Sequence, residues 1–454
     1  MDRPDWHGPL TEAYEQATRF LTGLPEREVG SRATLEELRA ALGGPLPDAG
    51  SDAREVVARL AEAADPGIVA SPSGRFFGFV IGGATPAALA ADWLTATWDQ
   101  NAGLYAAGPA AAVVEDVAGG WLRDLFGLPA QASAGFVTGA QMSHVTALAA
   151  ARHEVLRRAG WDVETDGLHG APRIAVLAGA DRHSTIDRAL RFLGIGTAAL
   201  VPVDVDDQGR MTTAGLRAAL AGLDGPAIVC AQLGNVNTGA FDPIGEICDV
   251  AHAAGAWVHV DGAFGLWAAT SARLRHLVTG VDRADSWTTD AHKWLNVPYD
   301  SGLVFCAHPA AHRAAMGVRA AYLVHAGGDE RDALDYNPEF SRRARGFAVY
   351  AALRALGRTG VESLIDRGCD LAARFARRMS GRVLNDVVLN QVLVGFGPAT
   401  PDLVRRVQAE GTCWVSGTLW RGAPAMRFSV SNFTTDEADI DRAADTILRL
   451  AAGT

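Results

Sequence analysis

Between residues 173 and 306 the chain repeats one pattern, a short apolar or β-branched run followed in most cases by a segment of helical length. Strands that are apolar on both faces are buried on both faces, and a helix that joins two such strands makes them parallel. The pattern therefore predicts a mostly parallel sheet covered by helices on both sides. In such a sheet the functional side chains gather beyond the carboxyl ends of the strands. The predicted strands are residues 173–178, 199–203, 227–230, 256–260, 284–289 and 302–306, and the helices between them are 183–193, 213–223 and 244–254.

The segments before and after this region predict two further parts. Residues 1–72 contain helical patterns interrupted by Gly and Pro at 43–47, and this arm is too small to form its own core, so it should pack on another domain or subunit. Residues 309–345 are polar and predict a mobile loop or hinge. We divide the chain into an N-terminal helical arm (1–72), a large domain (73–345) and a small α+β C-terminal domain (346–454). The other predicted helices are 11–21, 31–42, 53–64, 145–159, 346–356, 361–379 and 435–451, and the other predicted strands are 391–395 and 425–430.

Composition excludes several classes of protein. The net charge of −11 and the lack of a Lys/Arg-rich run argue against a nucleic-acid partner. The longest apolar uncharged stretch, residues 76–91, is short for a membrane span and contains Gly and Pro, and residues 1–5 lack the apolar region of a signal peptide. The five cysteines lie far apart without a C-x-x-C pair, which predicts neither disulfides nor a zinc site. We expect a cytoplasmic enzyme with no membrane and no metal.

The most informative segment is residues 286–298, which contains Lys293 among large apolar side chains. Its neighbours Trp287, Trp294 and Leu295 predict a partly dry pocket around the amine. A desolvated lysine has a lowered pKa and becomes a nucleophile that can form a Schiff base. The alternative is that Lys293 is a solvated surface charge, since lysine is rarely buried without a partner.

A carboxylate in the same region completes a chemical pair. Asp261 follows a buried strand, and a buried carboxylate needs a cationic partner or a proton. It lies 32 residues before Lys293, the length of one strand–helix–strand crossing, so both side chains can reach the same edge of adjacent strands. This pair suits pyridoxal phosphate, with Lys293 on the aldehyde and Asp261 beside the ring nitrogen.

Two further features fit that cofactor, although each is weak alone. Residues 137–144 precede a predicted helix and offer backbone N–H groups to a phosphate. His183 follows a strand and is placed to stack on the ring, although a lone histidine is more often structural.

Other motifs are rejected or retained only as alternatives. The Gly-rich residues 194–199 follow a helix instead of a strand, so they do not form a dinucleotide-binding turn, and no P-loop sequence occurs. His259, Asp261 and His292 could form the two-histidine, one-carboxylate triad of a metal-dependent oxygenase. That interpretation is kept as a competitor of a different class.

Taken together, His292-Lys293-Trp294 and the segments 260–264, 237–243 and 75–79 resemble the group II pyridoxal-phosphate-dependent amino acid decarboxylases, which include the aromatic amino acid, glutamate and histidine decarboxylases. The resemblance runs from about residue 70 to the C-terminus. It implies the aspartate-aminotransferase-type fold (fold type I) and a homodimer with active sites at the subunit interface. It also implies decarboxylation of an L-amino acid to the amine and carbon dioxide.

The resemblance assigns roles to individual residues. Lys293 would form the Schiff base, Asp261 would pair with the ring nitrogen and His183 would stack on the ring. The remaining cofactor contacts would be Gly139, Ala140 and Gln141 on the phosphate, helped by His292, and Ala263 on the other ring face.

The chain also departs from the family. Ser73-Gly74 replaces the usual His-Pro, and Gly139-Ala140-Gln141 replaces a Gly-Gly-Thr type of sequence. The family protonates the α-carbon with a tyrosine of a mobile loop, for which Tyr322 and Tyr336 are the candidates. Because a fold does not fix the reaction type, a retro-aldol lyase, an aminotransferase and an aldehyde synthase remain alternatives.

The identity of the amino acid is poorly encoded. Arg427 could bind a carboxylate or form an interdomain salt bridge. Five aromatic residues would line an apolar pocket or form ordinary core: Phe76, Phe77, Phe79, Trp98 and Tyr105.

Overall fold

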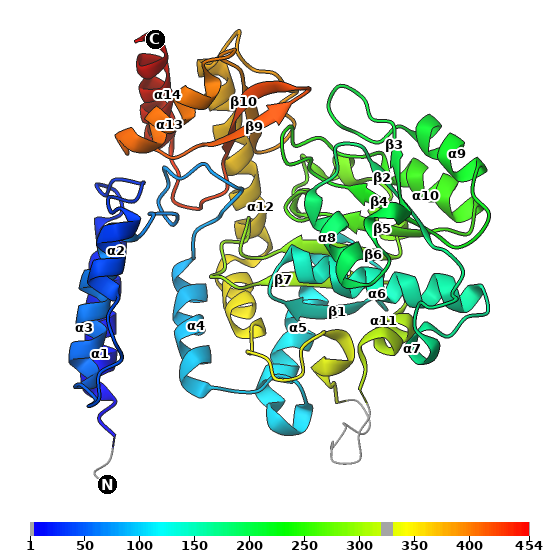
Figure 1. Ribbon diagram of the computed structural model, residues 1–454, viewed down its shortest axis with the longest axis horizontal. Helices are drawn as coiled ribbons and strands as arrows, with labels where there is room; N and C mark the ends of the chain where they lie inside the picture. The colour runs from blue at the N-terminus through cyan, green and yellow to red at the C-terminus, as the bar shows by residue number, and fades with distance from the viewer. Residues whose placement is uncertain (1–3, 319–329, 454) are drawn as a thin grey trace.

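A computed structural model describes residues 4–318 and 330–453. Within these residues a seven-stranded sheet has the order β1-β7-β6-β5-β4-β2-β3 (Figure 1). Only β7 runs against the other six strands, so the predicted mostly parallel sheet is confirmed. The strands are β1 (Ser133–Val137), β2 (Ala175–Gly179), β3 (Leu200–Val203), β4 (Ala227–Gln232), β5 (Trp257–Asp261), β6 (Ser286–Asp290) and β7 (Gly302–Cys306).

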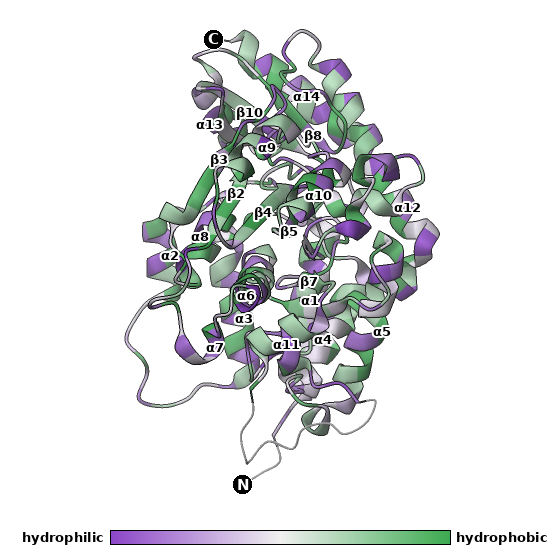
Figure 2. Ribbon diagram, turned by 90° about the vertical axis from the view of Figure 1, so that its right-hand side faces the viewer, coloured by the Kyte–Doolittle hydropathy of each residue, from purple (hydrophilic) through white to green (hydrophobic). Residues whose placement is uncertain are grey.

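Both faces of this sheet are covered by helices, as the apolar strands predict. In β4, Ile228 and Cys230 pack in the core under one helical layer, and Val229 and Ala231 pack in the core under the other. The strands β2 and β3 are accordingly coloured mostly as hydrophobic in Figure 2. One layer contains α6 (Ala140–Arg158), α8 (Ser184–Phe192) and α11 (Pro309–Met316), and the other contains α5 (Pro109–Phe126), α9 (Thr213–Ala221) and α10 (Ile244–Ala253).

The N-terminal arm consists of α1 (His7–Gly23), α2 (Leu35–Leu42) and α3 (Ala53–Ala64), and it stands at one side of the molecule (Figure 1). Its helices pack on one another. The buried guanidinium of Arg75 ties the arm to the body, because it donates to the carbonyls of Pro25 at 2.9 Å, Arg27 at 2.7 Å and Thr412 at 2.5 Å.

A long helix, α12 (Gly346–Arg378), connects the two hydrophobic cores of the body. Gly357 lies at φ 62°, a conformation that favours glycine, and interrupts this helix between the two helices that the sequence predicts. Residues up to Cys369 pack in the large core together with the sheet, whereas residues from Leu371 onward pack in the second core. The domain boundary at 345/346 stays a prediction.

The second core belongs to a three-stranded antiparallel sheet in the order β8-β10-β9. Phe428 of β10 stacks between Phe77 and Phe375, with ring centroids 3.9 and 3.5 Å apart. The predicted strands β8 (Gln391–Val394) and β10 (Ala423–Ser429) and the predicted helix α14 (Glu437–Ala452) are confirmed. The strand β9 (Ser416–Trp420) and the helix α13 (Thr400–Glu410) were not predicted.

Some other expectations were incomplete or wrong. The polar segment 309–345 is not a continuous loop, because α11 and the short helix η7 (Ala333–Tyr336) lie in it. The helices α4 (Pro86–Trp98) and α5 were not predicted. Among the described residues, no helix combines the length and the apolar character needed to cross a membrane. The remaining elements are α7 (Val163–Asp166), η1 (Asp65–Gly67), η2 (Tyr105–Ala107), η3 (Thr197–Ala199), η4 (Gly265–Thr270), η5 (Arg275–Val278) and η6 (Val281–Arg283).

Candidate active site

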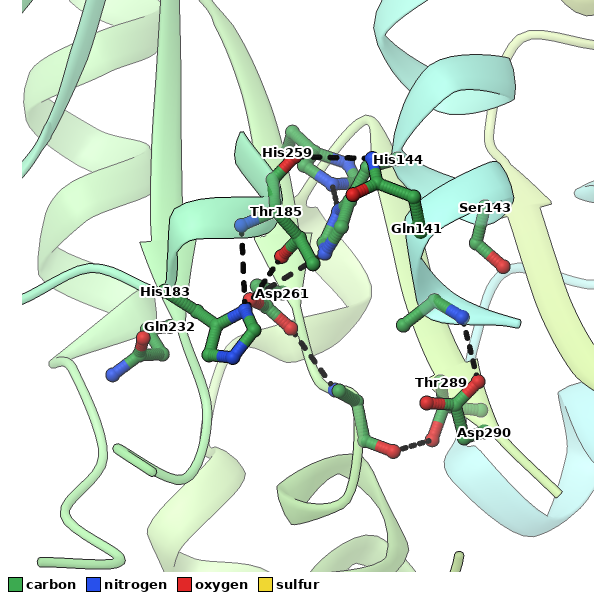
Figure 3. Close-up of polar contacts among 12 residues, drawn as sticks. Gln141, Ser143, His144, His183, Thr185, Gln232, His259, Asp261, Thr289 and Asp290 are labelled. Carbon is green, nitrogen blue, oxygen red and sulfur yellow. Dashed lines mark hydrogen bonds and ion pairs between the residues drawn. The ribbon is translucent and has the colours of Figure 1, made fainter. Parts of the chain in front are cut away.

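The parallel strands bring most of the predicted residues to one edge of the sheet. Asp261 ends β5 and Asp290 ends the neighbouring parallel strand β6, with Lys293 three residues further along the chain. His183 follows β2 and lies near Asp261 in Figure 3, and Gly139 follows β1, which points in the same direction as β6. The crossing from β5 to β6 is made by the short helices η4, η5 and η6, where the sequence predicted one helix.

Asp261 is a buried carboxylate surrounded by hydrogen-bond donors. Its Oδ1 accepts the Ala263 N–H at 3.1 Å, and its Oδ2 lies 3.5 Å from His144 Nε2. Burial alone would raise the pKa of Asp261, but His144, His183 and the Ala263 N–H outweigh burial and hold it below the usual range. The carboxylate is therefore ionised in the site, as a partner of a protonated ring nitrogen must be.

Behind Asp261 lies a pair of buried histidines to which sequence reasoning gave no such role. His144 Nδ1 is 2.9 Å from His259 Nε2, and His259 Nδ1 is 2.9 Å from Ser286 Oγ. Both nitrogens of His259 are thus occupied, and no cluster of three or more His, Cys, Asp or Glu able to hold a metal occurs in residues 4–318 and 330–453. The triad of His259, Asp261 and His292 is therefore not formed.

His183 is held in a fixed orientation at the first turn of α8. As the N-cap residue it accepts the Thr185 N–H at Nδ1, 3.3 Å away, and Nδ1 is 2.9 Å from Thr185 Oγ1. Burial lowers the pKa of His183, although the charge of Asp261 opposes this. A neutral imidazole fixed through Nδ1 and lying near Asp261 suits stacking on the cofactor ring.

Lys293 forms an ion pair that the sequence did not predict. Its Nζ is 3.1 Å from Asp290 Oδ2, and its side chain keeps 22% of its surface exposed. Trp287, Trp294 and Leu295 are fully buried in the large core. Because the Lys293 side chain itself stays partly exposed, the surroundings of the amine are only partly dry.

The N-terminus of α6 already holds an anion. Ala140 N–H donates to Asp290 Oδ1 at 2.6 Å, so this donor of the expected phosphate cradle is in use. Gly139 is the N-cap residue of α6 and lies close to β7. This contact requires glycine at position 302, since a Cβ at Gly302 would lie 2.4 Å from the Gly139 Cα. The positive end of a helix favours anions, which fits a phosphate as well as the carboxylate present here.

The ring of His292 lies beside Gly139. Its Nδ1 accepts the Ser301 N–H at 3.1 Å, which leaves Nε2 facing Asp290 Oδ2 at 3.6 Å. Burial lowers the pKa of His292. Its ring stacks on Tyr299, with centroids 4.3 Å apart.

One buried amide connects the lysine turn to the small sheet. Asn296 Oδ1 accepts the N–H groups of Gly83 at 2.6 Å and Phe433 at 3.0 Å. Its Nδ2 donates to the carbonyls of Trp294 and Ser431, both at 2.9 Å. The left-handed φ of 55° at Asn296 is one that asparagine tolerates.

The residues at this edge fit pyridoxal phosphate, because an amine, an ionised buried carboxylate and an anion-binding helix end lie at the same edge of the sheet. Residues 36–395 match the family described as the pyridoxal-dependent decarboxylase conserved domain. This chain belongs to that family. As a pyridoxal-dependent decarboxylase it is a carboxy-lyase that uses pyridoxal phosphate on an amino acid.

Individual relatives act on different amino acids. Tryptophan decarboxylase 1 of Oryza sativa subsp. japonica is 28% identical over 84% of this chain and 81% of its own length. The L-2,4-diaminobutyrate decarboxylase of Rhizobium meliloti (strain 1021) is 31% identical over 74% of this chain and 66% of its own. A crystal structure of Oryza sativa TDC with PLP and tryptamine has a TM-score of 0.91 at 24% identity and covers 100% of this chain and 99% of that one. The predicted fold type I is thereby confirmed for this decarboxylase.

Of the two candidate proton donors of the decarboxylase, the structure describes Tyr336. Tyr322 lies outside the described residues. Tyr336 lies in η7, where its hydroxyl accepts from Arg313 at 2.8 Å. It lines a cavity of about 170 Å³ near Ser133, which starts β1, whereas the site lies beyond the other end of that strand.

The five aromatic residues do not line one pocket. Phe77 belongs to the second core, and Trp98 packs edge-on against Phe347. Phe76 and Phe79 contact the Trp414 ring, with centroids 4.9 and 5.0 Å apart. Tyr105 lies in η2. The expected apolar pocket is therefore not formed by these five residues, although Gly82, three residues after Phe79, lies close to the Lys293 carbonyl.

Proposed function

We propose that Lys293 and Asp261 carry the decarboxylation of an amino acid in this chain, with Lys293 bonding the cofactor aldehyde and Asp261 holding a proton at the ring nitrogen. The observation that supports this is their position at the ends of adjacent parallel strands, with His183 nearby. When bound, pyridoxal phosphate supplies the electron sink for the carbanion left by carbon dioxide.

The other residues of the edge would orient the ring. His183, neutral and fixed by Thr185, would cover one ring face, and Ala263 the other. Gly139, Ala140 and Gln141 at the start of α6, together with His292, would hold the phosphate. The Ala140 N–H becomes available to a phosphate only when Asp290 releases it.

Replacement of Lys293 tests this assignment. We expect Lys293→Ala to lose the visible absorbance of the cofactor-loaded protein and all turnover, because Lys293 is the only lysine in the sequence. Arg182→Ala, which removes a cation paired with Asp187, is a matched control that should retain both. Wild-type protein that never turns yellow with pyridoxal phosphate would disprove the proposal.

Arg427 is proposed to bind a carboxylate of the substrate. It is mostly buried on β10, and burial lowers its pKa with no acidic group opposing this. Its charge contributes to the lowered pKa of His183, so the two side chains lie near each other. Among the described residues its Nε has no hydrogen-bond partner and no carboxylate pairs with it. A buried cation without a counterion favours binding an anion.

Substitution of Arg427 should therefore act on substrate binding. We expect Arg427→Gln to raise KM about 10-fold or more, the factor for one hydrogen bond to a charged group, with little change in cofactor affinity. A panel of aromatic, acidic and basic amino acids, with carbon dioxide, amine and aldehyde all measured, would identify the substrate and separate decarboxylation from aldehyde synthesis. An unchanged KM for every substrate of the panel contradicts the role of Arg427.

A cytoplasmic homodimer with active sites at the subunit interface completes the proposal. The arm exposes apolar side chains one helical turn apart, Leu10 and Tyr14 on α1 and Val56 and Leu60 on α3. Exposed apolar faces of this kind are typical of protein interfaces. The five cysteines are buried and free, which supports a reducing compartment.

A further inference from the structure

Four buried side chains form a hydrogen-bonded chain that leads from the core to Asp261. Trp257, His259 and Asp261 alternate along β5 and therefore point to the same face of the sheet, the face that α6 covers. Ser286 lies opposite His259 on β6, and His144 comes from α6. Figure 3 shows His144 between His259 and Asp261.

The indole at the far end determines the direction of this chain. Trp257 Nε1–H can only donate, and it lies 2.9 Å from Ser286 Oγ. The Ser286 hydroxyl must then use its own hydrogen elsewhere, and among the described residues its remaining side-chain partner is His259 Nδ1, 2.9 Å away. His259 Nδ1 is therefore an acceptor.

The positions of the protons on both imidazoles follow from this acceptor. Burial lowers the pKa of His259 to about 3, so this ring is neutral and carries its one proton on Nε2. Nε2–H donates to His144 Nδ1, 2.9 Å away. A ring nitrogen that accepts carries no proton and an imidazole keeps at least one, so the N–H of His144 lies on Nε2, which faces Asp261 Oδ2 at 3.5 Å. All three side chains behind the carboxylate are fully buried, so no solvent competes with this order: His144, His259 and Ser286.

We propose that Trp257, Ser286 and His259 form a directional relay that keeps the N–H of His144 turned toward Asp261, and that His144 is a positioning residue for this carboxylate. The inference rests on the proposed role of Asp261 at the ring nitrogen. If the relay were reversed, His144 would present a lone pair to the carboxylate. That contact repels the anion and favours a protonated Asp261, which cannot hold a proton on the cofactor ring.

Removal of one hydroxyl tests the relay at a distance from the site. In Ser286→Ala the His259 tautomer is no longer fixed, whereas Ser286→Thr keeps the hydroxyl. The readout is the ¹⁵N chemical shift of the ring nitrogen in protein loaded with ¹⁵N-labelled pyridoxal phosphate. We expect Ser286→Ala to move this shift toward the unprotonated value and to lower kcat about 10-fold, and Ser286→Thr to restore both.

Four further variants keep the test decisive. His144→Gln retains an N–H at the position of Nε2 and should keep the protonated shift, whereas His144→Leu should lose it. Should Ser286→Ala fail to fold, Trp257→Phe frees the same hydroxyl and should move the shift in the same direction. A protonated shift that persists in Ser286→Ala and His144→Leu overturns the relay. A protonated shift that persists in Asp261→Asn overturns instead the proposed role of Asp261.

Discussion

At the scale of single residues, Asp290 is the feature with the clearest consequence for the cofactor. Its carboxylate binds the Ala140 N–H at the start of α6 and pairs with Lys293, so one side chain engages both the predicted phosphate donor and the predicted nucleophile. A phosphate placed at this helix end would meet a second negative charge. Cofactor binding must therefore overcome the repulsion between its phosphate and the Asp290 carboxylate.

Neutralising this carboxylate should strengthen cofactor binding. We expect Asp290→Asn to lower the dissociation constant of pyridoxal phosphate about 3- to 10-fold at low salt, because a repulsion across a helix N-terminus is removed while an acceptor for Ala140 is kept. Fluorescence titration of the cofactor-free protein measures this. Asp282→Asn, on the exposed helix η6 before β6, makes the same change in net charge and should leave the affinity unaltered. Weaker binding in Asp290→Asn would contradict the argument.

The candidate site residues that follow strand ends could be predicted from the sequence, whereas those that depend on packing could not. Lys293, Asp261 and His183 could be placed because strand ends meet at one edge of a parallel sheet. His144 and Asp290 acquire their contacts only because α6 lies across β5 and β6, and no local pattern encodes that crossing. Arg427 comes from β10, more than a hundred residues beyond Lys293, and its direction follows from how the small sheet packs.

At the scale of elements, Asp285, which directly precedes β6, joins β5, the helix α10 and the segment after β7 at the opposite edge of the sheet. Its Oδ2 accepts the Val258 N–H at 2.7 Å and lies 3.0 Å from His252 Nε2, and Oδ1 lies 2.7 Å from His308 Nε2. Burial would raise the pKa of Asp285, but these hydrogen bonds outweigh it and bring the pKa to about 2.

This depressed pKa predicts an acid-dependent stability. A carboxylate whose pKa is lower in the folded chain stabilises the fold above its unfolded pKa of about 4, and that contribution is lost as the pH falls toward 2. We expect Asp285→Asn to lower the free energy of unfolding by about 2 kcal/mol at pH 7, with a difference that shrinks between pH 4 and pH 2. Denaturant titrations of both proteins across this range measure it. A difference that does not change with pH would contradict the prediction.

Elements were missed where their residues do not look like the structure they form. The helix α5 contains Gly119-Gly120, which is typical of a break, yet Gly119 is accommodated because a Cβ there would lie 3.1 Å from Ala134 of β1. The strand β9 is a partly exposed edge strand without a continuous apolar run. The buried strands of the large sheet were found because burial on both faces leaves an unbroken apolar pattern.

At the scale of the whole molecule, the N-terminal arm exposes apolar surface that a second subunit would cover. Leu10 and Tyr14 keep 54% and 59% of their surface exposed, and they lie one turn apart on α1. Two charges introduced at these positions would have to be buried without partners in a dimer.

We therefore expect Leu10→Glu/Tyr14→Glu to convert a dimer into a monomer and to reduce turnover, since the proposed active sites lie at the interface. Size-exclusion chromatography with light scattering measures the mass of each species. Leu46→Glu, at a loop residue that is 94% exposed, is the control and should remain dimeric. A wild-type protein that is monomeric at micromolar concentration would contradict the proposal.

The four hydrogen bonds of Asn296 have a mechanical consequence. The same amide binds the carbonyl of Trp294, the N–H of Gly83 and the segment after β10 at Ser431 and Phe433, so a swing of the C-terminal part would pull directly on the turn that carries the amine. Selectivity among amino acids in this enzyme must then come from how well the substrate fits a rigid binding site. The Asn296 hydrogen bonds oppose a closing movement of the C-terminal part around each substrate.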